Sequence, residues 1–324
     1  MRDYYLSSVV HLHVNYADLP FRADRDEQIA QSVTDRVSTA LGRAGDVYAY
    51  LLPSGIQMDT KQKLMARSLL TADHQEAPYS VLYLRMDEAL SVQTAMSDHA
   101  LIAARREGNG MMAALEDARR VRHQLAQEAL LARDEEYGYL TAHPCDAGTG
   151  MRASALVHLP MLLLARQTEK MTKMLGEKGM ILRPYSGEIG KVQGGLFVIE
   201  NRAALGKTAQ ERAQEVQECA EKICSAERRC REAAKEKGDV VVFDAVWRAY
   251  GIAKYARRLS VADVRNLWSS LTLGVTLEAF DLKDEVLHDL WELAEGKRPG
   301  ETDEMGNPDV LRAQRVRFLL NGGN

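Results

Sequence analysis

The sequence predicts an α+β protein in which a sheet flanked by helices is followed by a helical C-terminal domain. The chain has 324 residues, more than a single hydrophobic core usually accommodates, so we expect two domains. Short strand-like segments alternate with amphipathic helical patterns until about residue 241. Beyond Val242 the strand patterns vanish. We therefore predict a first domain over residues 1–241 and a helical domain over residues 242–324.

The predicted strands are short, rich in Val, Tyr and Leu, and bounded by turn-forming or charged residues. They are Asp46–Leu52, Ser80–Leu84, Leu90–Met96 and Leu196–Glu200. Helices are expected between them, and an apolar residue at every fourth position from Ile29 to Leu41 predicts one that packs on the sheet. The glycines between Gly138 and Gly150 exclude a continuous helix there, so we expect a strand, a loop and a second strand.

Residues that are typical of helix starts predict the remaining helices of the chain. Pro160 suits the first turn of a helix, which we expect to run to about Leu175. Thr208 and Glu211 have the spacing of a capping box and predict a long helix that ends near Lys237. The helices expected in the C-terminal domain are Asp244–Leu259, Ser260–Leu271, Asp284–Leu293 and Pro308–Leu320.

Composition narrows the class of protein. Hydrophobic residues make up 46% and charged residues 27%, which is ordinary for a folded protein. A net charge of -4 provides no field that would attract nucleic acid or an anionic membrane. The N-terminus lacks a signal-peptide core, and no apolar run is long enough to span a membrane. The four cysteines do not form a disulfide pattern, so we expect a reducing, cytoplasmic location; they are Cys145, Cys219, Cys224 and Cys230.

A motif in the middle of the chain carries the strongest signal. Residues Gly138 to Ser154 read GYLTAHPCDAGTGMRAS. This segment resembles the signature of the ATP:guanido phosphotransferase family, approximately GYLTxCPTNxGTGxRAS in phosphagen kinases and bacterial protein-arginine kinases. The resemblance continues in HLP, ILRPYSGE and LGK further along, and SSVVHLHVN at Ser7–Asn15 stands where the family has SSRIRLARN.

The resemblance covers nearly the whole chain and implies a fold, a cofactor and partners. The fold is an antiparallel sheet surrounded by helices, with a helical C-terminal domain that mediates homodimerisation in the family. The cofactor of an active member is ATP with Mg. The partners implied are protein arginine or phosphoarginine side chains, a zinc-binding activator and an AAA+ protease machine.

Phosphoryl transfer depends on cations that hold the triphosphate, and the family uses arginines for this purpose. The resemblance assigns two ATP-binding positions to Arg152 and Arg183. Other family arginines are replaced. Those of the SSRIRLARN segment fall at Val9, His11 and Val14, and that of the NEEDHLR strand falls at Ser91 if this strand is aligned with Arg85–Ser91.

The guanidinium acceptor needs carboxylates that orient it and take its proton. In the same alignment the catalytic glutamate becomes Asp87, with Glu88 beside it. A second acceptor-side glutamate becomes Lys191. The family's reactive cysteine falls at His143, while Cys145 lies two residues further on. The candidate catalytic residues are therefore Asp87, Glu88, His143 and Cys145.

The C-terminal segment PDVLRAQRVR resembles the RDxxRA element of protein-arginine kinases. Asp309 and Arg312 match it, whereas Pro308 replaces the leading arginine. In that branch the element helps to form an allosteric phosphoarginine site, so the resemblance implies that Asp309 and Arg312 bind phosphoarginine.

These replacements favour a degenerate, pseudokinase-like member that acts as a binding or regulatory subunit. The alternative is an active ATP-dependent kinase of protein arginines that has rebuilt its site from other cations; these are Arg85, Arg152, Arg183, Lys191 and Lys207.

Simpler interpretations compete at several positions. Arg152 is also expected as a structural ion-pair partner. His11 and His13 share a strand face but lack the further ligands of a metal site, so they are expected to pack. The GKT segment at Gly206–Thr208 reads as a helix cap rather than a phosphate loop.

Overall fold

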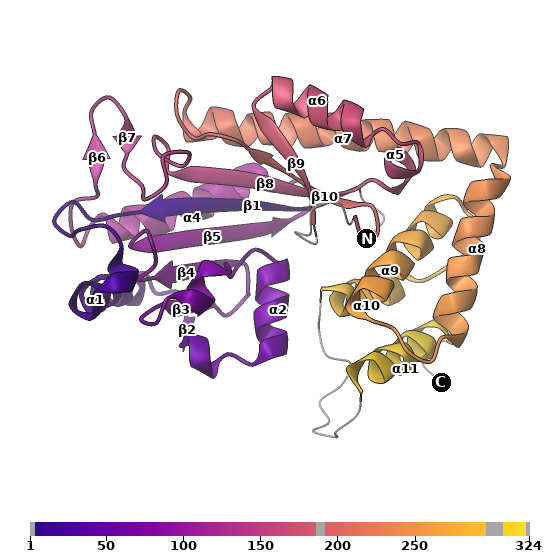
Figure 1. The fold of residues 1–324 in the computed structure, drawn as a ribbon, viewed down its shortest axis with the longest axis horizontal. Helices are drawn as coiled ribbons and strands as arrows, with labels where there is room; N and C mark the ends of the chain where they lie inside the picture. Colours follow the sequence, from indigo (N-terminus) through magenta and orange to yellow (C-terminus); the bar gives the residue numbers. More distant parts are fainter. Residues whose placement is uncertain (1–3, 186–191, 296–306, 322–324) are drawn as a thin grey trace.

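An antiparallel sheet forms the centre of the first domain (Figure 1). The structure is a computed structural model that describes residues 4–185, 192–295 and 307–321. The eight-stranded sheet has the order β2-β3-β4-β5-β1-β8-β10-β9, and every neighbouring pair is antiparallel. Its strands are β1 Tyr5–Val14, β2 Tyr48–Leu51, β3 Val81–Arg85, β4 Leu90–Thr94, β5 Ala100–Glu107, β8 Met151–His158, β9 Met180–Pro184 and β10 Leu196–Asn201. A separate hairpin pairs β6 Arg133–Asp134 with β7 Gly138–Tyr139.

Helices cover both faces of this sheet and form the C-terminal domain. Those of the first domain are α1 Glu27–Arg43, α2 Met58–Ala66, α3 Asp73–Glu76, α4 Met111–Leu125, α5 Pro160–Leu164, α6 Thr168–Glu177 and α7 Ala209–Lys237, with short 3-10 turns η1 Ala23–Arg25 and η2 Pro53–Gly55. Those of the C-terminal domain are α8 Val240–Tyr255, α9 Val261–Thr276, α10 Asp284–Ala294 and α11 Pro308–Leu320.

The alternation of side chains along β1 divides the core from the opposite face. Val10, Leu12 and Val14 are buried in the main core, where α1, α4 and α7 pack on the sheet. Because successive side chains of a strand point to opposite faces, His11 and His13 lie on the other face. That face is partly covered by α2 and α3, whose connecting residues Leu69 and Leu70 pack on β3. The same sequence pattern therefore builds the core on one face and places two histidines on the other face of the sheet.

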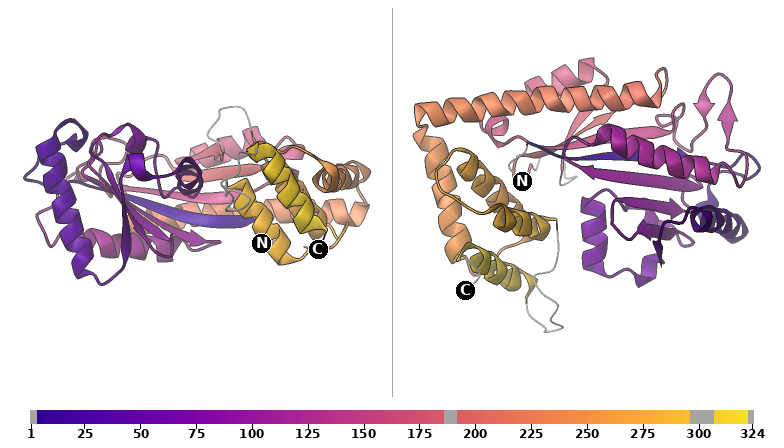
Figure 2. Two further views of the ribbon diagram at one scale, coloured as in Figure 1. Left: turned by 90° about the horizontal axis from the view of Figure 1, so that it is seen from below. Right: turned by 180° about the vertical axis from the view of Figure 1, so that it is seen from behind.

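The helical domain packs against one end of the sheet. A second core joins Trp268 and Trp291 of α9 and α10 to Leu156 and Val198 of β8 and β10. Figure 2 shows α8 leaving the end of the long α7 at a sharp angle. The helices α9, α10 and α11 lie beside α8 and below α7. The two helices meet at Gly238, whose left-handed φ of 59° caps α7. The boundary predicted at residue 241 falls in the first turn of α8.

Several predicted elements differ from those observed. The helix expected from Pro160 to about Leu175 is two helices, because Arg166 takes a positive φ of 55° between α5 and α6. Helix α8 begins at Val240, four residues before the predicted Asp244, because Asp239 caps it. The capping box of Thr208 and Glu211 is confirmed. Among the described residues no helix is long and apolar enough to cross a membrane.

Candidate functional site

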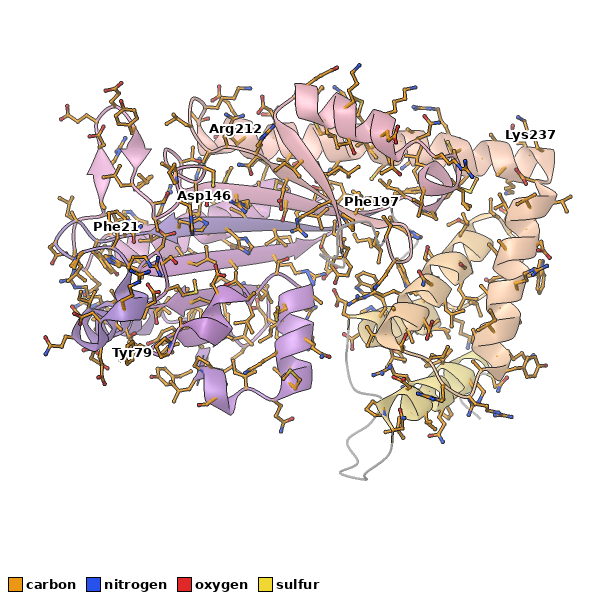
Figure 3. The ribbon with its side chains drawn as sticks, viewed as in Figure 1. Phe21, Tyr79, Asp146, Phe197, Arg212 and Lys237 are labelled. Atoms are coloured by element: carbon orange, nitrogen blue, oxygen red, sulfur yellow. The ribbon has the colours of Figure 1, made fainter. Side chains whose placement is uncertain are left out.

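A cavity of about 340 Å³ lies on the face of the sheet that carries His11 and His13. Its walls come from β1, β8, the turn between β4 and β5, the start of α3, and the signature loop between β7 and β8. Figure 3 places the labelled Asp146 in this region of the ribbon, above β1. The lining residues are His11, His13, Thr71, Asp73, Met96, Ser97, Asp98, Leu101, His143, Cys145, Asp146 and Arg152.

Glycines allow the signature loop to fold back on the sheet. Gly138 has a φ of 78°, and a Cβ there would lie 2.5 Å from the carbonyl oxygen of Gly148. Gly150 has a φ of 64°, and a Cβ there would lie 2.9 Å from the carbonyl oxygen of His13. Only glycine tolerates both the positive φ and these approaches. The loop therefore delivers His143, Cys145 and Asp146 to the cavity.

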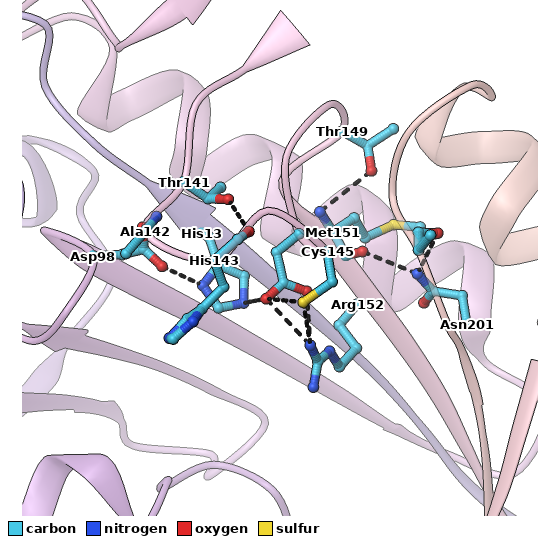
Figure 4. Close-up of polar contacts among 12 residues, drawn as sticks. His13, Asp98, Thr141, Ala142, His143, Cys145, Thr149, Met151, Arg152 and Asn201 are labelled. Atoms are coloured by element: carbon cyan, nitrogen blue, oxygen red, sulfur yellow. Dashed lines mark hydrogen bonds and ion pairs between the residues drawn. The ribbon is translucent and has the colours of Figure 1, made fainter. Parts of the chain in front are cut away.

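His13 and Asp98, which both line the cavity, form a hydrogen-bonded pair (Figure 4). Nδ1 of His13 lies 2.8 Å from Oδ2 of Asp98, and Nε2 lies 3.8 Å from Oδ2 of Asp146. Asp98 also accepts hydrogen bonds from the side chain of Asn15 and the backbone N–H of Ala142. Burial alone would raise the pKa of Asp98, but these partners, led by His13, hold it below its ordinary value. Asp98 is therefore ionised at neutral pH.

Arg152 is engaged by Asp146, which stands where the family signature has asparagine. The guanidinium donates to Oδ1 of Asp146 at 2.8 Å and to Oδ2 at 3.2 Å. It also lies 3.7 Å from Sγ of Cys145. Asp146 is only 4% exposed. The signature arginine thus has a fixed, charged partner, as the ion-pair interpretation predicted.

His11, which replaces a family arginine, has a structural role. Its Nε2–H donates to the carbonyl oxygen of Ser68 at 2.8 Å. Burial lowers the pKa of His11 to about 4, so the ring is neutral at neutral pH. Nearby, the hydroxyl of Ser91 donates to the carbonyl oxygen of Leu69 at 2.6 Å. His11 and Ser91, which were expected to replace phosphate-binding arginines of the family, therefore hold the segment after α2 against the sheet.

The structure does not bring Asp87 and Glu88 to the cavity. Both lie in the turn between β3 and β4, where Asp87 pairs with Arg85 at 2.9 Å and is 53% exposed. Glu88 pairs with Lys63 at 2.7 Å and Arg67 at 2.6 Å. The next turn, between β4 and β5, lines the cavity instead.

The turn between β4 and β5 also matches the family motif NEEDHLR better than the turn between β3 and β4 does. The Asp-His pair of NEEDHLR is present as Asp98–His99, which places the motif's counterpart at Ala95–Leu101 rather than Arg85–Ser91. In this register the two adjacent glutamates become Met96 and Ser97, and the arginine becomes Leu101. The signal that the first alignment missed was this Asp-His pair, followed directly by the buried strand β5.

Two further predicted cations, Arg183 and Lys207, are also paired. Nε of Arg183 lies 3.2 Å from Oε2 of Glu200 on the adjacent strand β10. Lys207 pairs with Glu215 of α7. Lys191 lies outside the described residues.

The predicted phosphoarginine residues lie on α11, apart from the cavity. Arg312 donates to the carbonyl oxygen of Leu259 at 3.0 Å and pairs with Asp309. Arg315 lies 3.5 Å from Asp289 of α10. The guanidinium group of Arg312 therefore contacts the loop between α8 and α9, and that of Arg315 contacts α10. Binding of phosphoarginine at this place stays a prediction.

The described residues contain no cluster of side chains suited to bind a metal ion. No group of three or more His, Cys, Asp or Glu side chains within them could hold an ion. His11 and His13 instead bind a carbonyl oxygen and a carboxylate. On α7, Cys219 and Cys224 are buried.

Comparison with solved structures identifies the fold as that of phosphagen kinases. The chain matches lombricine kinase with a TM-score of 0.62 at 21% identity, covering 74% of this chain and 68% of the other. It matches the substrate-free duplicated taurocyamine kinase from Schistosoma mansoni with a TM-score of 0.57 at 19% identity, covering 70% of this chain and 32% of the other.

Sequence comparisons define the family. The family model described as ATP:guanido phosphotransferase, C-terminal catalytic domain, matches residues 28–230. A protein-arginine kinase of Symbiobacterium thermophilum is 31% identical, covering 98% of this chain and 94% of the relative. One from Bacillus subtilis is 28% identical, covering 98% of this chain and 90% of the relative. The chain belongs to the ATP:guanido phosphotransferase family.

Proposed function

We propose that this protein is a degenerate, protein-arginine-kinase-like member of its family that binds arginine or phosphoarginine side chains of other proteins without transferring phosphate from ATP. The observation that supports this proposal is that candidate basic residues of the protein are paired with carboxylates. Each described basic residue that the sequence offered for a rebuilt site has a carboxylate partner. These pairs are Arg85–Asp87, Arg152–Asp146, Arg183–Glu200 and Lys207–Glu215.

The charge of the cavity opposes nucleotide binding. Among the described lining residues, three carboxylates, those of Asp73, Asp98 and Asp146, stand against one guanidinium, that of Arg152. Between charges 4 Å apart near a protein surface, the Coulomb energy is about 4 kcal/mol at an effective dielectric of about 20. A triphosphate would therefore meet repulsion where active phosphoryl-transfer sites provide cations. The described residues do not fit Mg·ATP, and we derive no step through it.

The same charge favours a guanidinium group. A planar guanidinium binds carboxylates through paired N–H donors, and the cavity presents carboxylates beside the apolar side chains of Met96 and Leu101. By analogy with its relatives, we expect the bound group to be an arginine side chain of a protein. We also expect a cytoplasmic homodimer that works with a zinc-binding activator and an AAA+ protease machine.

Titration calorimetry with Mg·ATP tests the proposal. We expect no binding at micromolar concentrations for the wild-type protein, because its cations are already paired. Micromolar binding that disappears in Arg152→Ala would overturn the proposal and favour the alternative of an active arginine kinase. Arg85→Ala is the matched control, because it removes a paired guanidinium outside the cavity.

A further inference from the structure

The thiol of Cys145 is an exposed nucleophile in the cavity that contains His13, and arginine binding alone leaves it unused. Cys219 and Cys224 are buried on α7, whereas Cys145 is exposed and lines the cavity. The guanidinium of Arg152 lies 3.7 Å from Sγ of Cys145 and places a positive charge beside the sulfur. Reactive cysteines occur in accessible surroundings with a nearby cation, so this thiol is placed for chemistry.

One carboxylate oxygen connects Cys145 to His13. The thiol donates to Oδ2 of Asp146 at 3.6 Å, and Nε2 of His13 lies 3.8 Å from the same oxygen. On the other side of the ring, Nδ1–H donates to Asp98 at 2.8 Å, which fixes the orientation of the imidazole. Figure 4 shows the side chains of His13, Cys145 and Arg152 gathered at one place. A thiol, an imidazole and an orienting carboxylate are the groups that nucleophilic catalysis uses.

The walls of the same cavity suit a guanidinium group. Asp73 lines the cavity and is exposed, and no ion-pair partner of its carboxylate is found among the described residues. A carboxylate of this kind accepts paired N–H bonds from a planar guanidinium. Met96 and Leu101 add apolar surface to the wall. The volume of about 340 Å³ is sufficient for the end of one side chain, and the exposure of Asp73 and Cys145 leaves the cavity open to it.

We propose that this cavity converts the guanidinium group of a bound arginine side chain into the urea group of citrulline and releases ammonia. The inference rests on the proposed function, because the cavity must first bind arginine. It adds a reaction that the cluster around Asp146 can perform with water as the second reactant. A guanidinium carbon is electrophilic, and a group held by Asp73 in the same cavity presents this carbon to the thiol.

The reaction has two steps that balance. In the first, the thiol proton of Cys145 passes by way of Asp146 to Nε2 of His13, and sulfur bonds to Cζ of the arginine. One Cζ–N bond then breaks, and His13 gives its proton to the departing ammonia. In the second, water attacks Cζ, the Cζ–S bond breaks and the sulfur regains a proton, while the other water proton passes through His13 and leaves as ammonium. Nothing is oxidised or reduced, because one C–N bond is exchanged for one C–O bond.

Incubation of the wild-type protein with an arginine-containing peptide, without ATP, tests the proposal. We expect citrulline, measured by mass spectrometry, and ammonia, measured by a coupled assay, in equal amounts. Cys145→Ala should abolish both products, and His13→Asn should slow their formation about a hundredfold or more. Cys230→Ala is the matched control, because it removes a thiol of α7 outside the cavity, and it should act like the wild type. No citrulline from the wild type, or equal amounts from a Cys145→Ala variant that thermal unfolding shows to be folded, would overturn the proposal.

Alkylation distinguishes a failure of this inference from a failure of the proposed function. 2-Chloroacetamidine carries a cationic amidine that resembles a guanidinium group, and it bonds to sulfur with loss of chloride; chloroacetamide is its neutral counterpart. Relative to their rates with free cysteine, we expect the amidine to label Cys145 about tenfold faster than the amide, and the arginine peptide to slow this labelling. Protection by the peptide without citrulline would overturn the reaction alone. Neither preference nor protection would contradict arginine binding in this cavity as well.

Discussion

Replacing Asp146 with asparagine should restore part of the affinity for phosphate groups. The substitution keeps the shape of the side chain and restores the residue of the family signature, but it removes the charge that holds Arg152. Two N–H···O contacts of 2.8 and 3.2 Å join the guanidinium to Asp146. Hydrogen bonds to charged groups contribute about 1.5 to 3 kcal/mol. Because Arg152 is 39% exposed, we take the lower end of that range.

A gain of about 1.4 kcal/mol corresponds to about tenfold in affinity. Calorimetry with inorganic pyrophosphate should therefore detect binding by Asp146→Asn that is about tenfold tighter than that of the wild type. Asp87→Asn is the matched control, because it removes an equal charge from a pair with Arg85 outside the cavity. Equal affinities for the two variants would refute the view that Asp146 neutralises the signature arginine.

Three further predictions concern stability and the C-terminal helix. Glu227→Gln should lower the free energy of unfolding by about 3 to 5 kcal/mol in urea, because it leaves the buried Arg231 without its charged partner; a loss below about 1 kcal/mol would contradict this. The pKa of His11 falls from 6.5 to about 4 on folding, so its contribution to stability is present above pH 6.5 and is lost as the pH falls towards 4. Unfolding measured across this range should therefore depend less steeply on pH in His11→Gln, and an unchanged slope would count against a buried neutral ring. Finally, a phosphoarginine peptide should bind the wild type more tightly than Arg312→Ala, whereas equal binding would leave that arginine with its structural contact to Leu259 alone.

The parts of the fold that local chemistry determines could be predicted from the sequence. The capping box at Thr208 and the glycine at position 238 define both ends of α7. The glycines of the signature segment correctly predicted a strand, a loop and a strand. The break after α5 could not be predicted, because Arg166 adopts its positive φ without glycine or proline to signal it.

The site was harder to predict because two similar turns follow each other. Asp87 and Glu88 provide carboxylates in the first turn, but the turn that enters the cavity holds Ser97 and Asp98. Pairing of strands decides which turn reaches β1, and β5 rather than β3 lies beside it. An ion pair of Arg152 was expected only as one interpretation of the arginine, and its partner Asp146 was not named from the sequence.

The absence of phosphoryl transfer is the central claim, and a direct assay for phosphoarginine tests it. The protein is incubated with Mg·ATP and an arginine-rich protein substrate, and phosphoarginine is quantified by mass spectrometry, with the Bacillus subtilis protein-arginine kinase as the positive control. We predict no phosphoarginine above the level found without the protein, because Arg152, the one arginine among the described residues that line the cavity, is held by Asp146. Phosphoarginine that forms with the wild type and is lost in Arg152→Ala would contradict the account and identify an active kinase.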